Sequence, residues 1–171
     1  MASQNKPDHA AYIARLTNAL DDKHRGDRAA LRRYWSPTTR HQAYPILGKL
    51  NALGDDRKTI LCALFAEHPL HKTGNSLGKA ALYLGDRKDG NHPFDRHFRR
   101  LLACDDLTDL GGQLHRLVKR LSRDGIALDY AALHRDLNFW ANYADRVKLD
   151  WASQFWQAPI PESQAEPEAK S

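Results

Sequence analysis

Apolar positions recur along this chain with the spacing of α-helices. The clearest case is a set of residues that falls within an arc of about 100° when successive residues are placed ~100° apart. This set consists of Leu107, Leu110, Leu114, Leu117, Val118 and Leu121. A shorter set just before it repeats the arrangement with Phe94, Phe98, Leu101 and Leu102. The pattern therefore predicts two consecutive amphipathic helices.

Capping and helix-breaking residues divide the chain into about eight helical segments. We expect helices over 10–22, 28–35, 46–53, 56–66, 76–84, 93–104 and 105–124, and then two helices between 130 and 156. Asp27, Asn75 and Asp129 are expected N-caps, because a short polar side chain there can accept from a free backbone N–H. Gly85 and Gly125 are expected to end helices, because glycine readily adopts the left-handed conformation.

Composition supports an all-α fold. Leucine occurs 23 times, whereas valine and isoleucine together occur seven times, and β-branched residues favour strands. The 171 residues suffice for one domain or for two small helical lobes. We expect a compact helical bundle over residues 1–157, with Trp140, Trp151 and Phe155 in its core. Residues 158–171 are rich in Pro, Glu, Ser and Ala, which predicts a disordered acidic tail.

The chain is basic, with a net charge of +5. The tail holds three Glu and one Lys, so the remainder carries +7. This charge favours an anionic partner, most often nucleic acid, although a membrane surface or plain solubility fits too. The longest apolar run, Ile60–Ala66, is about a third of a membrane span, and no signal sequence is evident. Cys62 and Cys104 lie in apolar patterns and are expected to be reduced, which predicts a cytoplasmic protein.

Positive charges cluster on the polar faces of three predicted helices. They are Arg28, Arg32 and Arg33; Arg96, Arg99 and Arg100; and Arg116, Lys119, Arg120 and Arg123. One such row is ordinary for a solvated face, because Arg is a good helix former. Three rows, which we expect to be unpaired with acids on the same face, favour a phosphate backbone as the ligand. The rows do not indicate which nucleic acid.

Catalytic and metal-binding patterns are weak in this sequence. His68 and His71 lie close together, but no third ligand is evident, so we expect no metal site and no cofactor. Arg87 and His92 have the Arg-x4-His spacing of HEPN-type ribonucleases, yet the glycine between them interrupts the helix that this site requires. A helix-turn-helix is disfavoured because the break over 122–129 exceeds a turn of about 3–4 residues. An enzyme is therefore the less favoured interpretation.

The order of several segments resembles CasB, the small subunit of the type I-E CRISPR Cascade complex. These segments are SLGKAALYL (76–84), FDRHFRRLLACDDLTDL (94–110), QLHRLVKRL (113–121), IALDYAALHRDLNFW (126–140) and VKLDWASQFW (147–156). GDRAALRRYW (26–35) resembles the basic helix near the N-terminus of that family. The likeness covers about residues 10–157.

The resemblance implies an all-helical, non-enzymatic protein that is present as two copies in the complex and contacts guide RNA and target DNA. The contacts that it implies are Arg32 or Arg33, Lys79, Arg96, Arg99 or Arg100, and Arg116. His97 and His115 stand where the family is expected to carry Arg, and a neutral imidazole attracts phosphate weakly. Gly78 is expected either to allow close helix packing or to let a strand approach Lys79.

The sequence therefore predicts a non-catalytic subunit of a CRISPR RNA-guided surveillance complex that acts in antiviral defence. It would hold guide RNA (crRNA) and the target and displaced DNA strands, next to other Cascade subunits and a second copy of itself. The residues expected to bind nucleic acid are Arg28, Arg32, Arg33, Lys79, Arg96, Arg99, Arg100, Arg116, Lys119, Arg120 and Arg123. Two alternatives stay open: a HEPN-like ribonuclease or toxin, and a free-standing, non-specific DNA-binding protein.

Overall fold

The computed structural model describes residues 8–85 and 91–161. Within these ranges the chain forms eight α-helices and three short 3-10 helices, and it contains no β-strand. The α-helices are α1 (His9–Ala19), α2 (Arg25–Arg32), α3 (Tyr44–Lys49), α4 (Asp56–Glu67), α5 (Leu77–Leu82), α6 (Asp95–Leu102), α7 (Leu107–Asp124) and α8 (Tyr130–Trp156). The 3-10 helices are η1 (Asp22–His24), η2 (Arg33–Trp35) and η3 (Arg40–Ala43). The predicted all-α class is confirmed.

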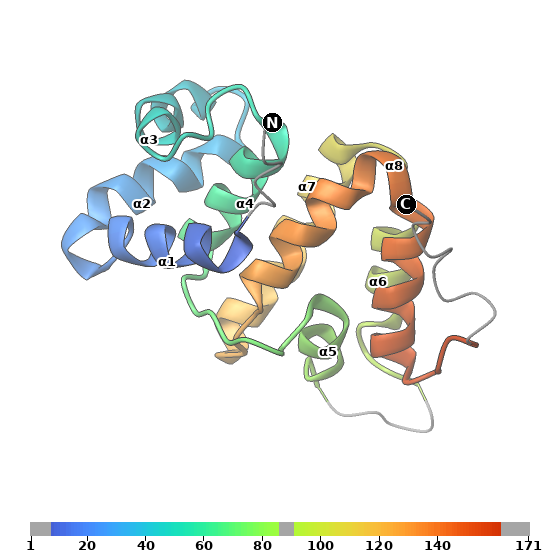
Figure 1. Ribbon diagram of the computed structural model, residues 1–171. Coiled ribbons are helices and arrows are strands. Elements are labelled where there is room, and N and C mark those ends of the chain that lie inside the picture. Colours follow the sequence, from blue (N-terminus) through green and yellow to red (C-terminus); the bar gives the residue numbers. More distant parts are fainter. Residues whose placement is uncertain (1–7, 86–90, 162–171) are drawn as a thin grey trace.

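The helices are arranged around the central helix α4. Figure 1 shows α1, α2 and α3 at one side of the molecule and α5, α6 and the last part of α8 at the other, with α7 and the first part of α8 between them. Helix α4 packs against α2, α7 and α8. All of its residues from Thr59 to Ala66 are buried, as expected for a helix that is apolar on every side. One continuous cluster of buried side chains joins both groups of helices.

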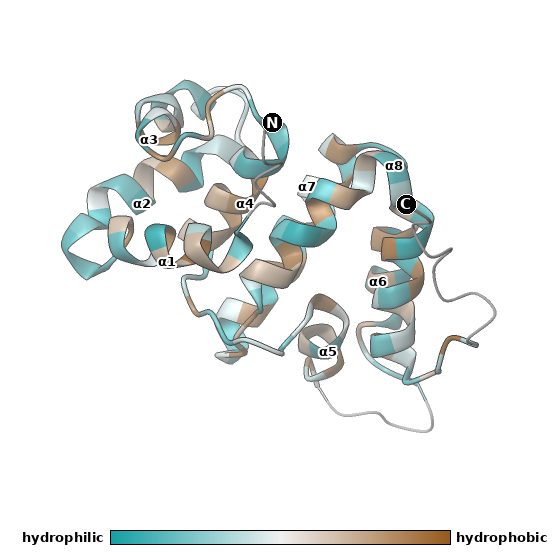
Figure 2. Cartoon of the chain, in the orientation of Figure 1, coloured by the Kyte–Doolittle hydropathy of each residue, from teal (hydrophilic) through white to brown (hydrophobic). Residues whose placement is uncertain are grey.

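Helix α7 has the apolar face that the sequence predicts. Figure 2 shows hydrophobic and hydrophilic residues alternating along the helices, as amphipathic helices require. The buried residues of α7 include Leu110, Leu114, Leu117, Val118 and Leu121. The Asp106 side chain accepts from the backbone N–H of Asp109 and caps the start of the helix. Gly125 ends it in the left-handed conformation, with φ of 68°.

Some predicted boundaries are wrong. Helix α2 begins at Arg25, so Asp27 lies in its first turn and is not its N-cap. Asn75 does not cap α5, because its side-chain amide donates to the carbonyl of Ala127. At Asn75 a tertiary hydrogen bond outweighs the capping preference of the residue type. The two helices predicted after Asp129, by contrast, are confirmed: they follow each other within α8 and are separated at Tyr143, where the backbone is non-helical with φ of −137° and ψ of 36°.

Gly78 allows α5 to pack tightly against α8. A Cβ atom at this position would lie 2.5 Å from the Cβ of Gln154 and 2.5 Å from the carbonyl oxygen of Trp151. The backbone N–H of Gly78 also donates to the side-chain oxygen of Gln154 at 3.2 Å. Of the two explanations for this glycine, close helix packing is therefore confirmed.

Other expectations about the core hold as well. Trp140, Trp151 and Phe155 are buried. Cys62 and Cys104 are buried free thiols, and burial raises the pKa of the Cys62 thiol to about 12. In the part of the chain that the structure describes, no helix has the length and apolar character needed to cross a membrane.

Candidate nucleic-acid interface

The basic faces of α6 and α7 lie against each other. The two helices are in contact, and the guanidinium of Arg120 lies over the ring of Phe94, the residue before α6, at 5.3 Å from its centroid. Partial desolvation lowers the pKa of His97 on α6, and nearby positive charges lower it further. These charges belong to Arg120, Arg100, Arg96 and Arg116. Because all four act on one imidazole, these four arginines lie together on one surface, called here the α6–α7 basic surface.

The four arginines of the α6–α7 basic surface are not neutralised by ion pairs in the part of the chain that the structure describes. Arg96, Arg100 and Arg116 are exposed, and Arg120 is half-buried. The lowered pKa leaves His97 uncharged at neutral pH, so it adds no further positive charge to the surface. Guanidinium groups gathered in this way match the oxygens of a phosphate backbone.

A second group of cations lies where α7 meets the end of α4. His115 donates to the carboxylate of Glu67 at 3.3 Å and stacks on Trp35, with ring centroids 4.4 Å apart. The hydrogen bond from His115 lowers the pKa of Glu67, and the charges of Lys119 and Arg32 lower it further. Arg32 on α2 and Lys119 on α7 therefore lie close to the same acid. His115, which we did not expect to bind phosphate, is held by this stack and hydrogen bond.

The expectation that the predicted cations are unpaired with acids is wrong for three of them. The pairs are Arg28 with Asp22 at 3.3 Å, Arg99 with Asp95 at 2.6 Å and Arg123 with Asp124 at 3.6 Å. Arg99 also lies over the ring of Trp156, which directs it towards α8. In each pair the acid lies close to its arginine in the sequence, at most six residues away. Such exposed pairs are weak, so they do not by themselves prevent phosphate binding.

The two remaining predicted residues lie on other elements. Arg33 is exposed on η2 and donates to the side-chain oxygen of Gln42. Lys79 is exposed on α5, beside the tightly packed Gly78. Neither lies on α6 or α7, the two helices that carry the α6–α7 basic surface.

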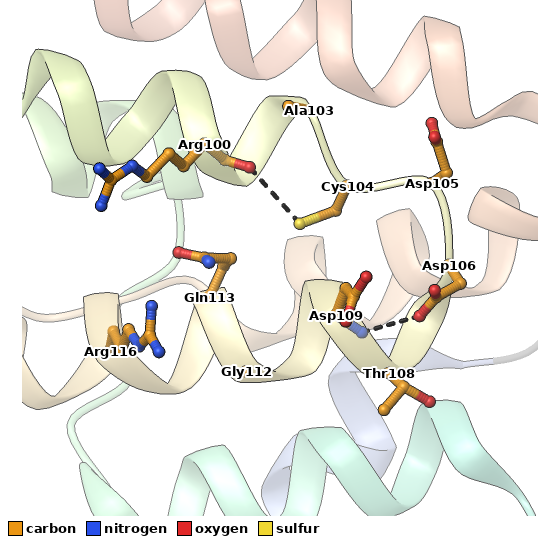
Figure 3. Close-up of a pocket in the computed structure, with 10 residues that line it drawn as sticks. All are labelled: Arg100, Ala103, Cys104, Asp105, Asp106, Thr108, Asp109, Gly112, Gln113 and Arg116. Carbon is orange, nitrogen blue, oxygen red and sulfur yellow. Dashed lines mark hydrogen bonds between the residues drawn. The ribbon is translucent and has the colours of Figure 1, made fainter.

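A hollow of about 600 Å³ adjoins the α6–α7 basic surface. It lies between the end of α6 and the first half of α7, and Figure 3 shows its two chemically different ends. One end carries Arg100, Gln113 and Arg116, whereas the other carries Asp105, Asp106 and Asp109. Sequence reasoning missed Gln113 and the glycine beside it, because it considered charges and motifs only. The i, i+3 spacing of Gln113 and Arg116 was the available signal.

The histidines considered for catalysis or metal binding have structural contacts. His92 is buried, its Nδ1 accepts from the N–H of Phe94 at 3.0 Å, and its Nε2 donates to the carbonyl of Leu82 at 2.8 Å. Its proposed partner, Arg87, lies outside the described residues. His68 and His71 each bond to backbone groups, and the described residues contain no cluster of three ligands that could hold a metal.

Comparison with known proteins gives family and fold matches. Residues 27–156 match the family described as CRISPR-associated protein Cse2. No curated protein matches the chain.

Three solved structures illustrate the fold match. A Cse2-family protein from Thermus thermophilus has a TM-score of 0.71 and 22% identity, covering 90% of this chain and 100% of that chain. CasB from Thermobifida fusca has a TM-score of 0.67 and 20% identity, covering 86% of this chain and 95% of that chain. A chain of a CRISPR RNA-guided surveillance complex has a TM-score of 0.66 and 21% identity, covering 87% of this chain and 91% of that chain. The family match spans most of the sequence and agrees with the resemblance to CasB, so this chain belongs to the CRISPR-associated Cse2 family.

Proposed function

We propose that this chain is a non-catalytic subunit of a CRISPR RNA-guided surveillance complex and that its α6–α7 basic surface holds nucleic-acid backbones. Membership of the Cse2 family supports a place in such a complex, as does the similarity in fold to a chain of one. The observation that carries the binding role is the gathering of four arginines around one uncharged imidazole. Its ligands are guide RNA and the target and displaced DNA strands, with other Cascade subunits and a second copy of this chain as neighbours.

Backbone binding fits this chemistry better than base reading does. In guide-RNA complexes base pairing reads the sequence, and the protein holds the strands through their geometry and charge. Opening a DNA duplex against a guide RNA is nearly balanced in free energy, so a few phosphate contacts can favour the open state. The α6–α7 basic surface supplies such contacts and needs no base-specific group.

The second group of cations extends the path of a bound strand. Arg116, Lys119 and Arg120 follow one another at i, i+3 and i, i+4 on α7, so they share one side of that helix. Lys119 in turn lies near the same acid as Arg32 of α2. A strand that leaves the α6–α7 basic surface can therefore continue over Lys119 towards Arg32.

The test removes two charges from this surface and two from elsewhere. Arg96→Ala with Arg116→Ala is compared with Arg15→Ala and Arg57→Ala, which lie on α1 and α4 and give the same net charge. Labelled RNA and duplex DNA of several sequences are titrated by fluorescence anisotropy at several salt concentrations. We expect the first variant to weaken binding of all sequences equally and to reduce the log–log salt slope by about 0.9 per lost duplex contact. Equal effects of both variants would show that only net charge matters and would contradict the proposal.

Assembly provides the second half of this test. The chain is co-purified with tagged neighbouring subunits and guide RNA, and R-loop formation is measured separately from guide loading. The Arg96→Ala and Arg116→Ala variant should enter the complex and load guide, yet form R-loops more slowly. A variant that assembles and forms R-loops at the normal rate would exclude the α6–α7 basic surface as the site.

A further inference from the structure

Gly112 lies in the interior of a helix, and the structure shows no packing contact that requires a glycine there. It is the sixth residue of the 18-residue helix α7, where glycine is unfavourable compared with alanine. A Cβ at the neighbouring Gly111 would lie 3.2 Å from Ile60, so that glycine has a packing role, whereas a Cβ at Gly112 would meet nothing within 4 Å. Gly26 and Gly48 also have open space, but they lie near the ends of α2 and α3, where helix propensity matters less.

The missing side chain contributes to the hollow between α6 and α7. Gly112 lines the hollow between the positions of Arg116 and Asp109, as Figure 3 shows. Arg100 reaches the same end of the hollow from α6, and Gln113 lies between the two arginines in that view. Neither Arg100 nor Arg116 forms an ion pair in the described part of the chain. The hollow therefore offers cationic and amide donors around a stretch of bare helix.

We propose that the sugar–phosphate backbone of a bound nucleic-acid strand enters this hollow and lies against Gly112, with a phosphate between Arg100 and Arg116. This inference rests on the proposed function and adds a steric contact to it. The amide of Gln113 can donate to a phosphate or sugar oxygen. The carboxylates of Asp106 and Asp109 at the other end repel phosphates, so the strand crosses α7 near Gly112 and does not follow it to its start.

The test fills the hollow without changing charge. Gly112→Leu, in the full chain, adds a bulky, uncharged side chain where space is open, and leucine is a good helix former. We expect the dissociation constant for labelled single-stranded RNA and DNA to rise about tenfold, while the melting temperature does not fall. Gly112→Ala should raise the melting temperature by about 1–4 °C and weaken binding less. Gly48→Leu, which is also exposed and unobstructed, is the matched control and should leave binding unchanged.

The outcomes separate this inference from the proposed function. If Gly112→Leu is folded and binds as the wild type does, while Arg96→Ala with Arg116→Ala weakens binding, only the Gly112 contact is refuted. If wild-type protein binds neither RNA nor DNA, both are refuted. If Gly112→Leu binds the oligonucleotides normally but no longer enters the complex, a partner subunit occupies the hollow and the inference is wrong. Loss of binding in Gly112→Leu alone, with the Gly48→Leu control intact, supports it.

Discussion

The carboxylate of Asp136 accepts a hydrogen bond from the indole N–H of Trp151 at 2.8 Å, in the buried interior of the protein. The two residues lie on opposite sides of the break at Tyr143, so this bond joins the two halves of α8. Asp136 also contacts the guanidinium of Arg135 at 3.2 Å. Because α5 packs against α8, and Gly78 lies against Trp151, the bond also supports the position of α5.

Replacing Asp136 should weaken the fold in proportion to the hydrogen bonding that is lost. Asp136→Ala leaves the buried indole N–H of Trp151 without an acceptor, and we expect a loss of roughly 1–3 kcal/mol in the free energy of unfolding. Asp136→Asn keeps an acceptor oxygen and should lose less. Urea denaturation followed by tryptophan fluorescence measures both. Equal stability of the alanine variant and the wild type would show that water or another group replaces the carboxylate.

The same residue should give the fold an unusual pH dependence. Burial raises the pKa of Asp136 above its ordinary value, although the bond from Trp151 and the charge of Arg135 oppose the shift. A raised pKa means that the folded state binds more protons than the unfolded state, so stability falls as pH rises through this window. The stability advantage of the wild type over Asp136→Asn should therefore be largest in acid and decrease towards neutral pH. An advantage that grows with pH would contradict this assignment.

Glu67 should give the stability of the fold the opposite pH dependence, and it should also affect nucleic-acid binding. Its pKa is lowered, first by the hydrogen bond from His115, so the stability it contributes is present above its ordinary pKa of 4.5 and is lost as pH falls through the lowered value. At neutral pH we expect Glu67→Gln to lower the free energy of unfolding by roughly 1 kcal/mol. Because the variant removes the acid near Arg32 and Lys119, it should also bind nucleic acid more tightly, by a few fold.

The control for Glu67 is Asp56→Asn at the other end of α4, which changes net charge by the same amount. It should have a smaller effect on nucleic-acid binding, measured by the same anisotropy titration. If Glu67→Gln is less stable and also binds nucleic acid more weakly than the wild type, then Glu67 positions Arg32 and Lys119 for binding, and its charge does not simply compete with the phosphates.

The structure shows which parts of the site were accessible from sequence. Periodicity within one helix correctly placed Arg116 and Arg120 on the polar side of α7, because that side depends only on the spacing of Leu114, Leu117 and Leu121. The contact of α7 with α6 was not predictable in this way. It depends on how the turn between Cys104 and Asp106 reverses the chain, which is a matter of tertiary packing.

Contacts between charged residues on distant elements could not be predicted from the sequence either. Glu67 is 48 residues from His115, and it ends a helix whose interior is buried on all sides, so no local pattern links it to Lys119 or Arg32. The pairing of Arg99 with Asp95 at i, i+4, by contrast, was visible in the sequence and was overlooked.

Gly78 should tolerate no side chain. In Gly78→Ala the new Cβ meets the backbone of Trp151 and the side chain of Gln154 at distances that force α5 and α8 apart. We expect a loss of about 1–3 kcal/mol in the free energy of unfolding, measured by urea denaturation. Gly26→Ala, where the space is open, should be neutral or slightly stabilising. Similar stability for both variants would mean that α5 can shift without loss of packing.

The acidic tail, predicted over residues 158–171, should be dispensable for folding. The backbone N–H of Ala158 donates to the carbonyl of Ser153 at the end of α8, and the Ser153 hydroxyl donates to the carbonyl of Ala158. A deletion that begins at residue 158 would remove these hydrogen bonds, so the test begins the deletion at residue 162. Residues 162–171 lie outside the described residues, and their composition gives little apolar area to bury. Deleting 162–171 should leave the melting temperature unchanged and strengthen non-specific binding slightly, because three Glu and one Lys are lost and the net charge rises by two. A marked fall in melting temperature would show that the tail packs on the helices.

His92 should contribute to stability and not to RNA cleavage. A general base needs a ring nitrogen that is free to accept a proton, and both nitrogens of His92 are engaged by the backbone of Phe94 and Leu82. We expect purified protein to cleave neither labelled RNA nor DNA, with or without Mg²⁺. His92→Ala should instead lower the free energy of unfolding by roughly 1–3 kcal/mol, because it leaves buried backbone groups without partners. Cleavage that is abolished by Arg87→Ala, in a variant that melts like the wild type, would establish the HEPN-like ribonuclease in place of the proposed function.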